Sequence, residues 1–301
     1  MIIIDPYAIN DIHFQIDKII KGLGNPDPPL NLNEVRELLK LDRQYYSSSD
    51  DGILNEIVNK IKVGSRQLKR RPSLLYDVIK KLELKALWLP DRKRILIDDT
   101  IPDLKKRHVE AHEIIHSITP HHAPFFLGDD IITLQNSCYE KLEAEANYGS
   151  GQLLFLRNKF IEIAKCYPKN ISSIKKLSII FNNTMTMTLW RLIESSIDVP
   201  MFGTIGPHPL YACKDDNPFR YVITSSVFRE RFSNINPQTI LRAILSYIKP
   251  LKTGPIGEGE VSLYDLDDQS HSFYMETFHN TYEALTIGSY IGSSRKKIFT
   301  Y

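Results

Sequence analysis

The sequence PDLKKRHVEAHEIIHSITP, at residues 102–120, is the stretch that decides how the rest of the chain is interpreted. Its first two residues, a proline and an aspartate, favour the start of a helix. The final Thr119-Pro120 favours its end, because proline cannot continue a helix. Apolar residues recur between these ends at helical spacing: Leu104, Ala111, Ile115 and Ile118. The stretch therefore predicts one helix with an apolar side.

Two histidines of this helix are spaced as metal ligands. His112 and His116 are four residues apart, so both imidazoles lie on one helix face, about one turn from each other. A tetrahedral zinc site can take two of its ligands from such a pair. Glu113 lies beside them without being a ligand, so it can act as general base and then general acid on a zinc-activated water. The pattern predicts a hydrolytic zinc centre; the alternative is a helix whose histidines are ordinary surface or core residues.

The favoured third ligand lies on a second predicted helix, at about residues 139–164. Glu143 follows His116 by 27 residues and can present its carboxylate to the metal when the two helices pack together. Asn147, one turn further, lies on the same face and could orient a ligand histidine from behind. Glu145 points about 200° away on an ideal helix, so it is not expected on that face. The predicted cofactor is one Zn²⁺ per chain, with water in the fourth position.

A rival third ligand is His122. It stands at the third histidine of the pattern HExxHxxGxxH. The glycine of that pattern is replaced here by Thr119, which Pro120 follows, so the required turn is not evident. The sequence therefore favours Glu143 over His122 and leaves both open.

These motifs together resemble the ImmA/IrrE family of zinc metallopeptidases. That family has a strand, an arginine shortly before HExxH, and a later Glu-x-x-Ala-Asn helix. The matching residues here are RILID at 94–98, Arg107 before the zinc motif, and EAEAN at 143–147. Residues 177–192 are similar to a helix-turn-helix-like element of the family. The resemblance covers about residues 30–195.

The resemblance implies a regulatory zinc metalloendopeptidase of the gluzincin-like type. Family members cleave repressors of mobile elements or of stress regulons, so the implied partner is a protein substrate such as a transcriptional repressor. The strand at residues 94–98 could hold the substrate backbone by strand addition. His208 or Tyr211 could supply the oxyanion donor, although an ordinary loop histidine or core tyrosine is the more common role.

The alternative function is a non-catalytic metal-binding regulator, or one that binds DNA or protein. Residues 171–196 predict a helical pair that could read DNA. Its apolar residues are typical of a packing surface, however, so a helical hairpin is favoured over a DNA reader. Glu113 also favours the enzyme, because a purely structural zinc site does not need it.

The predicted fold class is α+β. We expect a mostly helical zincin-like domain with a small sheet at 1–165, a helix-turn-helix-like pair at 166–200, and a C-terminal α+β region at 201–301 that senses a signal or docks the substrate. We also predict helices at 54–61, 74–82 and 239–248, a basic cluster at 66–71, strands at 219–224 and 272–278, a mobile loop at 254–259, and a hairpin turn at 278–282.

The composition of the 301 residues is that of an ordinary globular protein, with 42% hydrophobic and 25% charged residues. The net charge of +2 gives no general attraction to nucleic acid or to acidic membranes. No stretch has the roughly 18 consecutive apolar residues of a membrane span. Three widely spaced cysteines are typical of reduced thiols, so a soluble cytoplasmic protein is expected.

Overall fold

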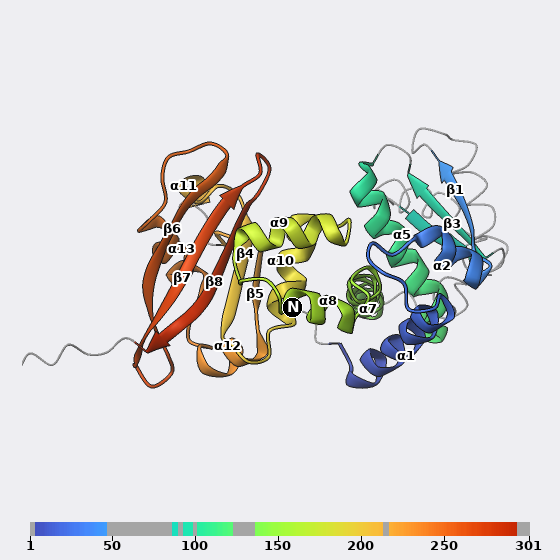
Figure 1. Ribbon diagram of the computed structural model, residues 1–301, viewed down its shortest axis with the longest axis horizontal. Coiled ribbons are helices and arrows are strands. Elements are labelled where there is room, and N and C mark those ends of the chain that lie inside the picture. The colour runs from blue at the N-terminus through green and yellow to red at the C-terminus, as the bar shows by residue number, and fades with distance from the viewer. Residues whose placement is uncertain are drawn as a thin grey trace, which may run out of the picture. The chain divides into compact units, whose positions relative to one another are not determined.

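The protein has an α+β fold, as the sequence predicts (Figure 1). It divides into two compact units, Met1–Arg157 with Phe181–Asn183, and Asn158–Ile180 with Thr184–Tyr301. The computed structural model describes residues 4–46, 86–89, 93–98, 101–122, 136–212 and 217–293. The helices predicted at 54–61 and 74–82 and the basic cluster at 66–71 lie outside these residues. No helix in the described ranges is long and apolar enough to cross a membrane.

The first unit is built around two packed helices, α5 and α7. The helix predicted from residues 102–120 is confirmed, since α5 spans Asp103–Ile118 and ends before the 3-10 turn η3 at Pro120–His122. Ile114 and Ile115 are fully buried on α5. The other helices of the unit contact this pair. In the described ranges they are α1 (Pro6–Gly22) and α2 (Leu32–Leu39), while α7 itself spans Asn136–Leu154.

The helix predicted at 139–164 is interrupted in the structure. It is replaced by α7 and a separate α8 at Asn158–Ala164. Leu156 and Arg157 have φ values of 52° and 48°, in the left-handed region that ends a helix. Arg157 also donates hydrogen bonds from Nη1 to the Asp17 carboxylate at 2.6 Å and to the His13 carbonyl at 3.0 Å. These bonds hold the chain in the turn.

A small three-stranded sheet packs against α5. Its strands are β1 (Asp42–Tyr46), β2 (Ala86–Leu89) and β3 (Arg94–Asp98). The order is β1-β3-β2, with β3 parallel to β1 and antiparallel to β2. The prediction that the strand at residues 94–98 accepts a substrate by strand addition is therefore wrong, because β3 is already paired on both edges.

The second unit contains a five-stranded antiparallel sheet of order β5-β4-β8-β7-β6. The strands are β4 (Met201–Gly206), β5 (Tyr221–Thr224), β6 (Gly254–Tyr264), β7 (Ser270–His279) and β8 (Ala284–Ser293). The helices, besides α8, are α9 (Ile171–Ile180), α10 (Met185–Glu194), α11 (Pro209–Ala212), α12 (Ser226–Arg231) and α13 (Pro237–Leu245).

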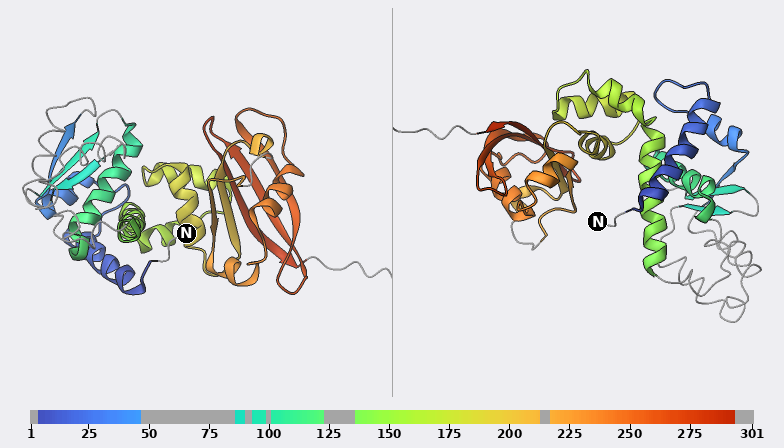
Figure 2. Two further views of the ribbon diagram at one scale, coloured as in Figure 1. Left: turned by 180° about the vertical axis from the view of Figure 1, so that it is seen from behind. Right: turned by 90° about the horizontal axis from the view of Figure 1, so that it is seen from below.

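Helices cover both faces of this sheet (Figure 2). Phe202 on β4 packs with Phe228 of α12 and with residues of α13. The next residue, Gly203, points to the opposite face, where a Cβ would come within 2.4 Å of Ile193 on α10. The lack of a side chain at Gly203 thus allows α10 to approach the strand closely.

Several predictions for the last hundred residues are confirmed. The strands expected at 219–224 and 272–278 are β5 and β7, the helix expected at 239–248 is α13, and the hairpin turn lies between β7 and β8. The mobile loop expected at 254–259 is wrong, because these residues begin β6. A glycine is needed at position 257, because a Cβ there would come within 2.7 Å of the Tyr247 carbonyl oxygen. The boundaries predicted at residues 165 and 200 stay predictions.

Candidate metal centre

Three of the predicted ligands converge between α5 and α7. His112 Nε2 lies 3.0 Å from His116 Nε2. Glu143 approaches both rings, with Oε2 3.3 Å from His112 Nε2 and Oε1 3.4 Å from His116 Nε2. We call His112, His116 and Glu143 the first His/Glu group; its members lie close enough to hold one metal ion.

The separations fit zinc. In a tetrahedral site with zinc–nitrogen and zinc–oxygen distances of about 2.0–2.2 Å, ligand atoms lie roughly 3.3–3.5 Å apart. The three separations of 3.0, 3.3 and 3.4 Å require only small adjustments. The donor set of two imidazoles and one carboxylate is also one that zinc accepts.

The other ring nitrogen of each histidine has its own hydrogen-bond partner. His112 Nδ1 lies 3.2 Å from Asn147 Oδ1, as the helix spacing predicts. An amide oxygen accepts a hydrogen bond, so His112 carries its hydrogen on Nδ1 and turns the Nε2 lone pair towards Glu143. His116 Nδ1 lies 2.8 Å from His122 Nδ1. Both rings thus present Nε2 to the space that Glu143 faces.

The pKa shifts of His116 and Glu143 favour the ionisation states that a metal requires, whereas at His112 the carboxylates of Glu143 and Glu113 outweigh burial and raise the pKa. Burial lowers the pKa of His116 to about 4, so this imidazole is neutral near pH 7. Burial acts to raise the pKa of Glu143, but the neighbouring rings of His112 and His116 outweigh it and hold that pKa well below its usual value. A neutral imidazole and an ionised carboxylate are the forms that bind a cation.

Glu113 is buried on α5 next to the first His/Glu group, and its charge acts to raise the pKa of His112. It is not one of the three grouped residues. His108 lies one turn before His112, and burial lowers its pKa to about 4. Its Nε2 is 3.3 Å from Ser150 Oγ. The α5 face therefore carries two further titratable side chains beside the group.

Two features fix α5 and α7 in place, and the sequence motifs indicated neither. Glu110, buried on α5, accepts from Arg36 Nε at 2.7 Å and from Arg43 Nη1 at 2.9 Å, which ties α5 to α2 and β1. Gly149 on α7 lies against Ile115, where a Cβ would come within 2.7 Å. This close approach lets α7 bring Glu143 to the histidines.

A second His/Glu group lies behind the first. It consists of His121, His122 and Glu145. Glu145 Oε2 is 2.7 Å from His121 Nε2 and 2.9 Å from His122 Nε2. Glu145 points away from the face of Glu143, as its spacing predicts, but η3 folds back to meet it. The sequence signal was the pair of histidines directly after the helix end at Pro120.

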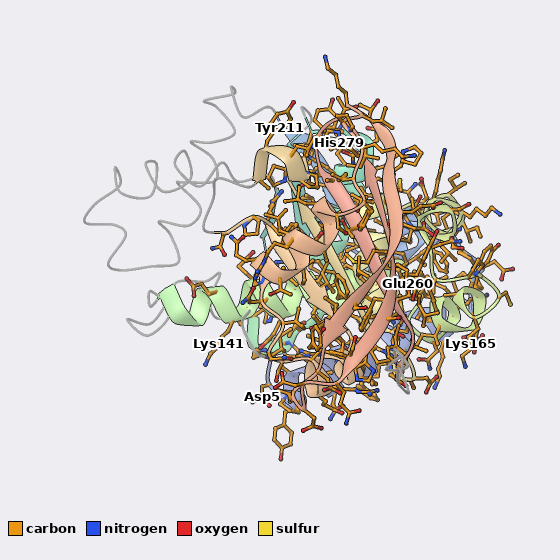
Figure 3. The ribbon with its side chains drawn as sticks, turned by 90° about the vertical axis from the view of Figure 1, so that its left-hand side faces the viewer. Asp5, Lys141, Lys165, Tyr211, Glu260 and His279 are labelled. Atoms are coloured by element: carbon orange, nitrogen blue, oxygen red, sulfur yellow. The ribbon has the colours of Figure 1, made fainter. Side chains whose placement is uncertain are left out.

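The two residues suggested as oxyanion donors belong to the second unit. His208 Nε2 donates to the Leu251 carbonyl at 3.0 Å, and the His208 ring contacts the rings of Tyr211 and His279. Tyr211 is 75% exposed, so it is not a core residue. Tyr211 and His279 lie at the same end of this unit (Figure 3). The oxyanion role of either residue stays a prediction.

Comparisons with known proteins find similarity in structure and none in sequence families or curated sequences. No protein-family profile matches the chain, and no curated protein matches it. One similar solved structure is described as a Mycobacterium tuberculosis transcriptional regulator, with a TM-score of 0.53 and 11% sequence identity. The match covers 94% of this chain and 88% of that chain. At this identity the likeness shows the fold alone. The chain therefore shares the fold of that structure and carries two His/Glu groups that could bind a metal ion.

Proposed function

We propose that this protein is a zinc-dependent endopeptidase of the ImmA/IrrE type that cleaves a regulatory protein partner. The observation that carries the proposal is the first His/Glu group beside Glu113, in which the two Nε2 atoms lie 3.0 Å apart and each lies 3.3–3.4 Å from one oxygen of Glu143. A structural zinc site is closed by four protein ligands, whereas a catalytic one has three and keeps a position for water or substrate. Among the residues that the structure describes, the group has three members, which fits the catalytic arrangement.

Each residue has a distinct task in this mechanism. His112, His116 and Glu143 hold the metal, and Asn147 fixes the ring of His112. Zinc, when bound, supplies Lewis-acid chemistry by polarising the scissile carbonyl and lowering the pKa of a water molecule. Glu113 takes the proton from that water and later transfers it to the leaving amine.

The substrate class follows from the resemblance and from the fold. The motifs at residues 94–98, 107–116 and 143–147 resemble those of peptidases that cleave repressors. A solved structure with a similar fold is described as a transcriptional regulator. Both support a regulatory protein substrate over a digestive role.

A non-catalytic regulator is the second candidate, and the description of that similar structure favours it. A DNA reader built on the helical pair has less support. A recognition helix must expose one face to the groove. On α10 only Glu194 is exposed, while Leu189, Leu192 and Ile193 are buried within the unit. A regulator that binds through another surface remains the alternative to test.

The substitution Glu113→Gln separates the two candidates. We expect it to leave zinc content near one per chain and to reduce cleavage of a co-expressed repressor by about 10²- to 10⁴-fold, the usual contribution of a general base. Cleavage is followed by intact-mass spectrometry of the partner, and zinc by elemental analysis.

The matched control is Asp103→Asn, which removes an exposed carboxylate from the same helix and should keep full activity. Equal cleavage by Glu113→Gln and the parent protein would exclude the acid–base role. A partner that binds without being cleaved by the parent protein would support the non-catalytic regulator.

A further inference from the structure

A continuous line of buried side chains runs from the first His/Glu group to Glu145. His116 Nε2 faces Glu143, and His116 Nδ1 lies 2.8 Å from His122 Nδ1. On the far side of the second ring, His122 Nε2 lies 2.9 Å from Glu145 Oε2. Exposed fractions are 1% for His116, 0% for His122 and 8% for Glu145, so water has little access to the line.

The position of every hydrogen in this line follows from metal binding at one end. A neutral imidazole has a single N–H. A metal ion on His116 Nε2 leaves the hydrogen on Nδ1, from which it is donated to His122 Nδ1. That nitrogen must then carry a lone pair, so the hydrogen of His122 lies on Nε2 and is donated to Glu145. Each step ends on an acceptor, and Glu145 has acceptor capacity alone when ionised.

We propose that His122 and Glu145 are positioning residues that hold His116 in the Nδ1–H tautomer, with its Nε2 lone pair directed at the metal. The inference rests on the metal site of the proposed function and adds a specific role for two residues outside the ligand set. A carboxylate at the end of such a line orients the ligand ring and raises its basicity. Here the effect passes through a second imidazole.

A second metal ion in the second His/Glu group is the competing interpretation, and the distances oppose it. His121 Nε2 and His122 Nε2 approach the same oxygen of Glu145, at 2.7 and 2.9 Å. These are hydrogen-bond lengths to one shared oxygen, whereas in the first group the two rings face separate carboxylate oxygens at 3.3 and 3.4 Å. One carboxylate oxygen has two lone pairs and can accept from both rings.

His121 shares Glu145 with His122 but does not take part in the line. Its side chain is 45% exposed, and among the described residues its Nε2 forms a hydrogen bond with Glu145. His121 is therefore a matched control, since its removal keeps the bond between His122 and Glu145. A second metal site would lose a ligand whichever of the two histidines is replaced.

The test compares zinc affinity in His122→Leu, His122→Gln and His121→Leu, by competition with a chromogenic chelator. Glutamine can accept from His116 through its oxygen and donate to Glu145 through its nitrogen, so it keeps the line. We expect His122→Leu to weaken zinc binding about 10- to 100-fold, the usual effect of losing such a partner. His122→Gln and His121→Leu should stay within about threefold of the parent protein.

Nitrogen-15 spectra of the zinc-loaded parent protein should show His116 as the Nδ1–H and His122 as the Nε2–H tautomer. The opposite tautomer at His122 would overturn the proposal, as would parent-like affinity in His122→Leu. Two zinc ions per chain, with one lost in both leucine variants, would establish the second metal site instead. A parent protein that binds no zinc would refute the proposed function and this inference together.

Discussion

The two His/Glu groups have the same composition and different geometry. Each combines two histidines with one glutamate of α7. In the first group, two nitrogens face two separate carboxylate oxygens at 3.3 and 3.4 Å. In the second group, two nitrogens meet one oxygen at 2.7 and 2.9 Å. Composition therefore does not identify a metal site; the separation of the ligand atoms and the nitrogen that each ring presents do.

The largest effect should come from breaking the first group. We expect Glu143→Ala to lower zinc from about one ion per chain to near none, because two imidazoles alone hold zinc weakly. His112→Ala and His116→Ala should do the same. The matched control is Glu140→Ala, which removes an exposed carboxylate from the same helix. Full zinc content in all three ligand variants, measured by elemental analysis after dialysis, would place the site elsewhere.

A smaller loss of zinc affinity should follow when the contact between Asn147 and His112 is removed. Asn147 holds His112 across 3.2 Å, as His122 holds His116 across 2.8 Å. We expect Asn147→Ala to weaken zinc binding by about 10- to 100-fold without abolishing it. Asn147→Asp keeps an acceptor at this position and should restore the affinity. If neither substitution changes the zinc dissociation constant, His112 is oriented by packing alone.

The third prediction concerns the contact that brings α7 to α5. An alanine at position 149 would place its Cβ 2.7 Å from Ile115, and overpacking of this kind typically costs about 1–3 kcal/mol. Part of that is offset, because alanine favours a helix over glycine by roughly 1 kcal/mol. We expect Gly149→Ala to lower the free energy of unfolding by up to about 2 kcal/mol in urea titrations.

Gly151 provides the control on the same helix. A Cβ there has no neighbour within 4 Å, so Gly151→Ala should stabilise the protein by about 0.5–1 kcal/mol. Opposite signs for the two alanines would show that α5 and α7 are in contact at Gly149. The same sign at both positions would contradict the close approach.

Local periodicity was enough to predict much of the first group. The bounds of α5 and the shared face of Glu143 and Asn147 depend on residues within a few turns, so spacing alone determines them. The second group was not predictable in the same way. It requires η3 to contact α7. The two residues that make this contact, His122 and Glu145, are 23 residues apart in the sequence. No local pattern encodes such a contact.

The order of the strands in the first sheet was also not predictable from the sequence. The stretch at residues 94–98 is recognisable as a strand, yet its central position depends on pairing with Asp42–Tyr46, about 50 residues away. The glycines at 254–259 were interpreted as a mobile loop because glycine favours turns. In the structure Gly257 and Gly259 make room for Tyr247 against β6. Both errors arise where tertiary packing overrides a local preference.

The second unit contains a third contact between a histidine and a carboxylate. Unlike the two His/Glu groups, this contact stabilises a turn. Asp265 Oδ1 accepts from the backbone of Asp267 at 3.0 Å and of Gln269 at 2.9 Å. Its Oδ2 lies 2.7 Å from His271 Nε2. Burial acts to raise the pKa of Asp265, but these hydrogen bonds outweigh it and lower that pKa below the usual value of 3.8.

The sign of the pH effect follows from that shift. A carboxyl group whose pKa is lower in the folded state stabilises the protein fully above its unfolded pKa, and this contribution is lost as pH falls through the folded value. We therefore expect Asp265→Asn to have a lower melting temperature than the parent protein above about pH 4, with the difference shrinking towards pH 3. Zinc content should stay unchanged, because Asp265 belongs to neither His/Glu group. Melting curves between pH 7 and 3 test this, and a constant difference across that range would show that Asp265 is not the group that titrates.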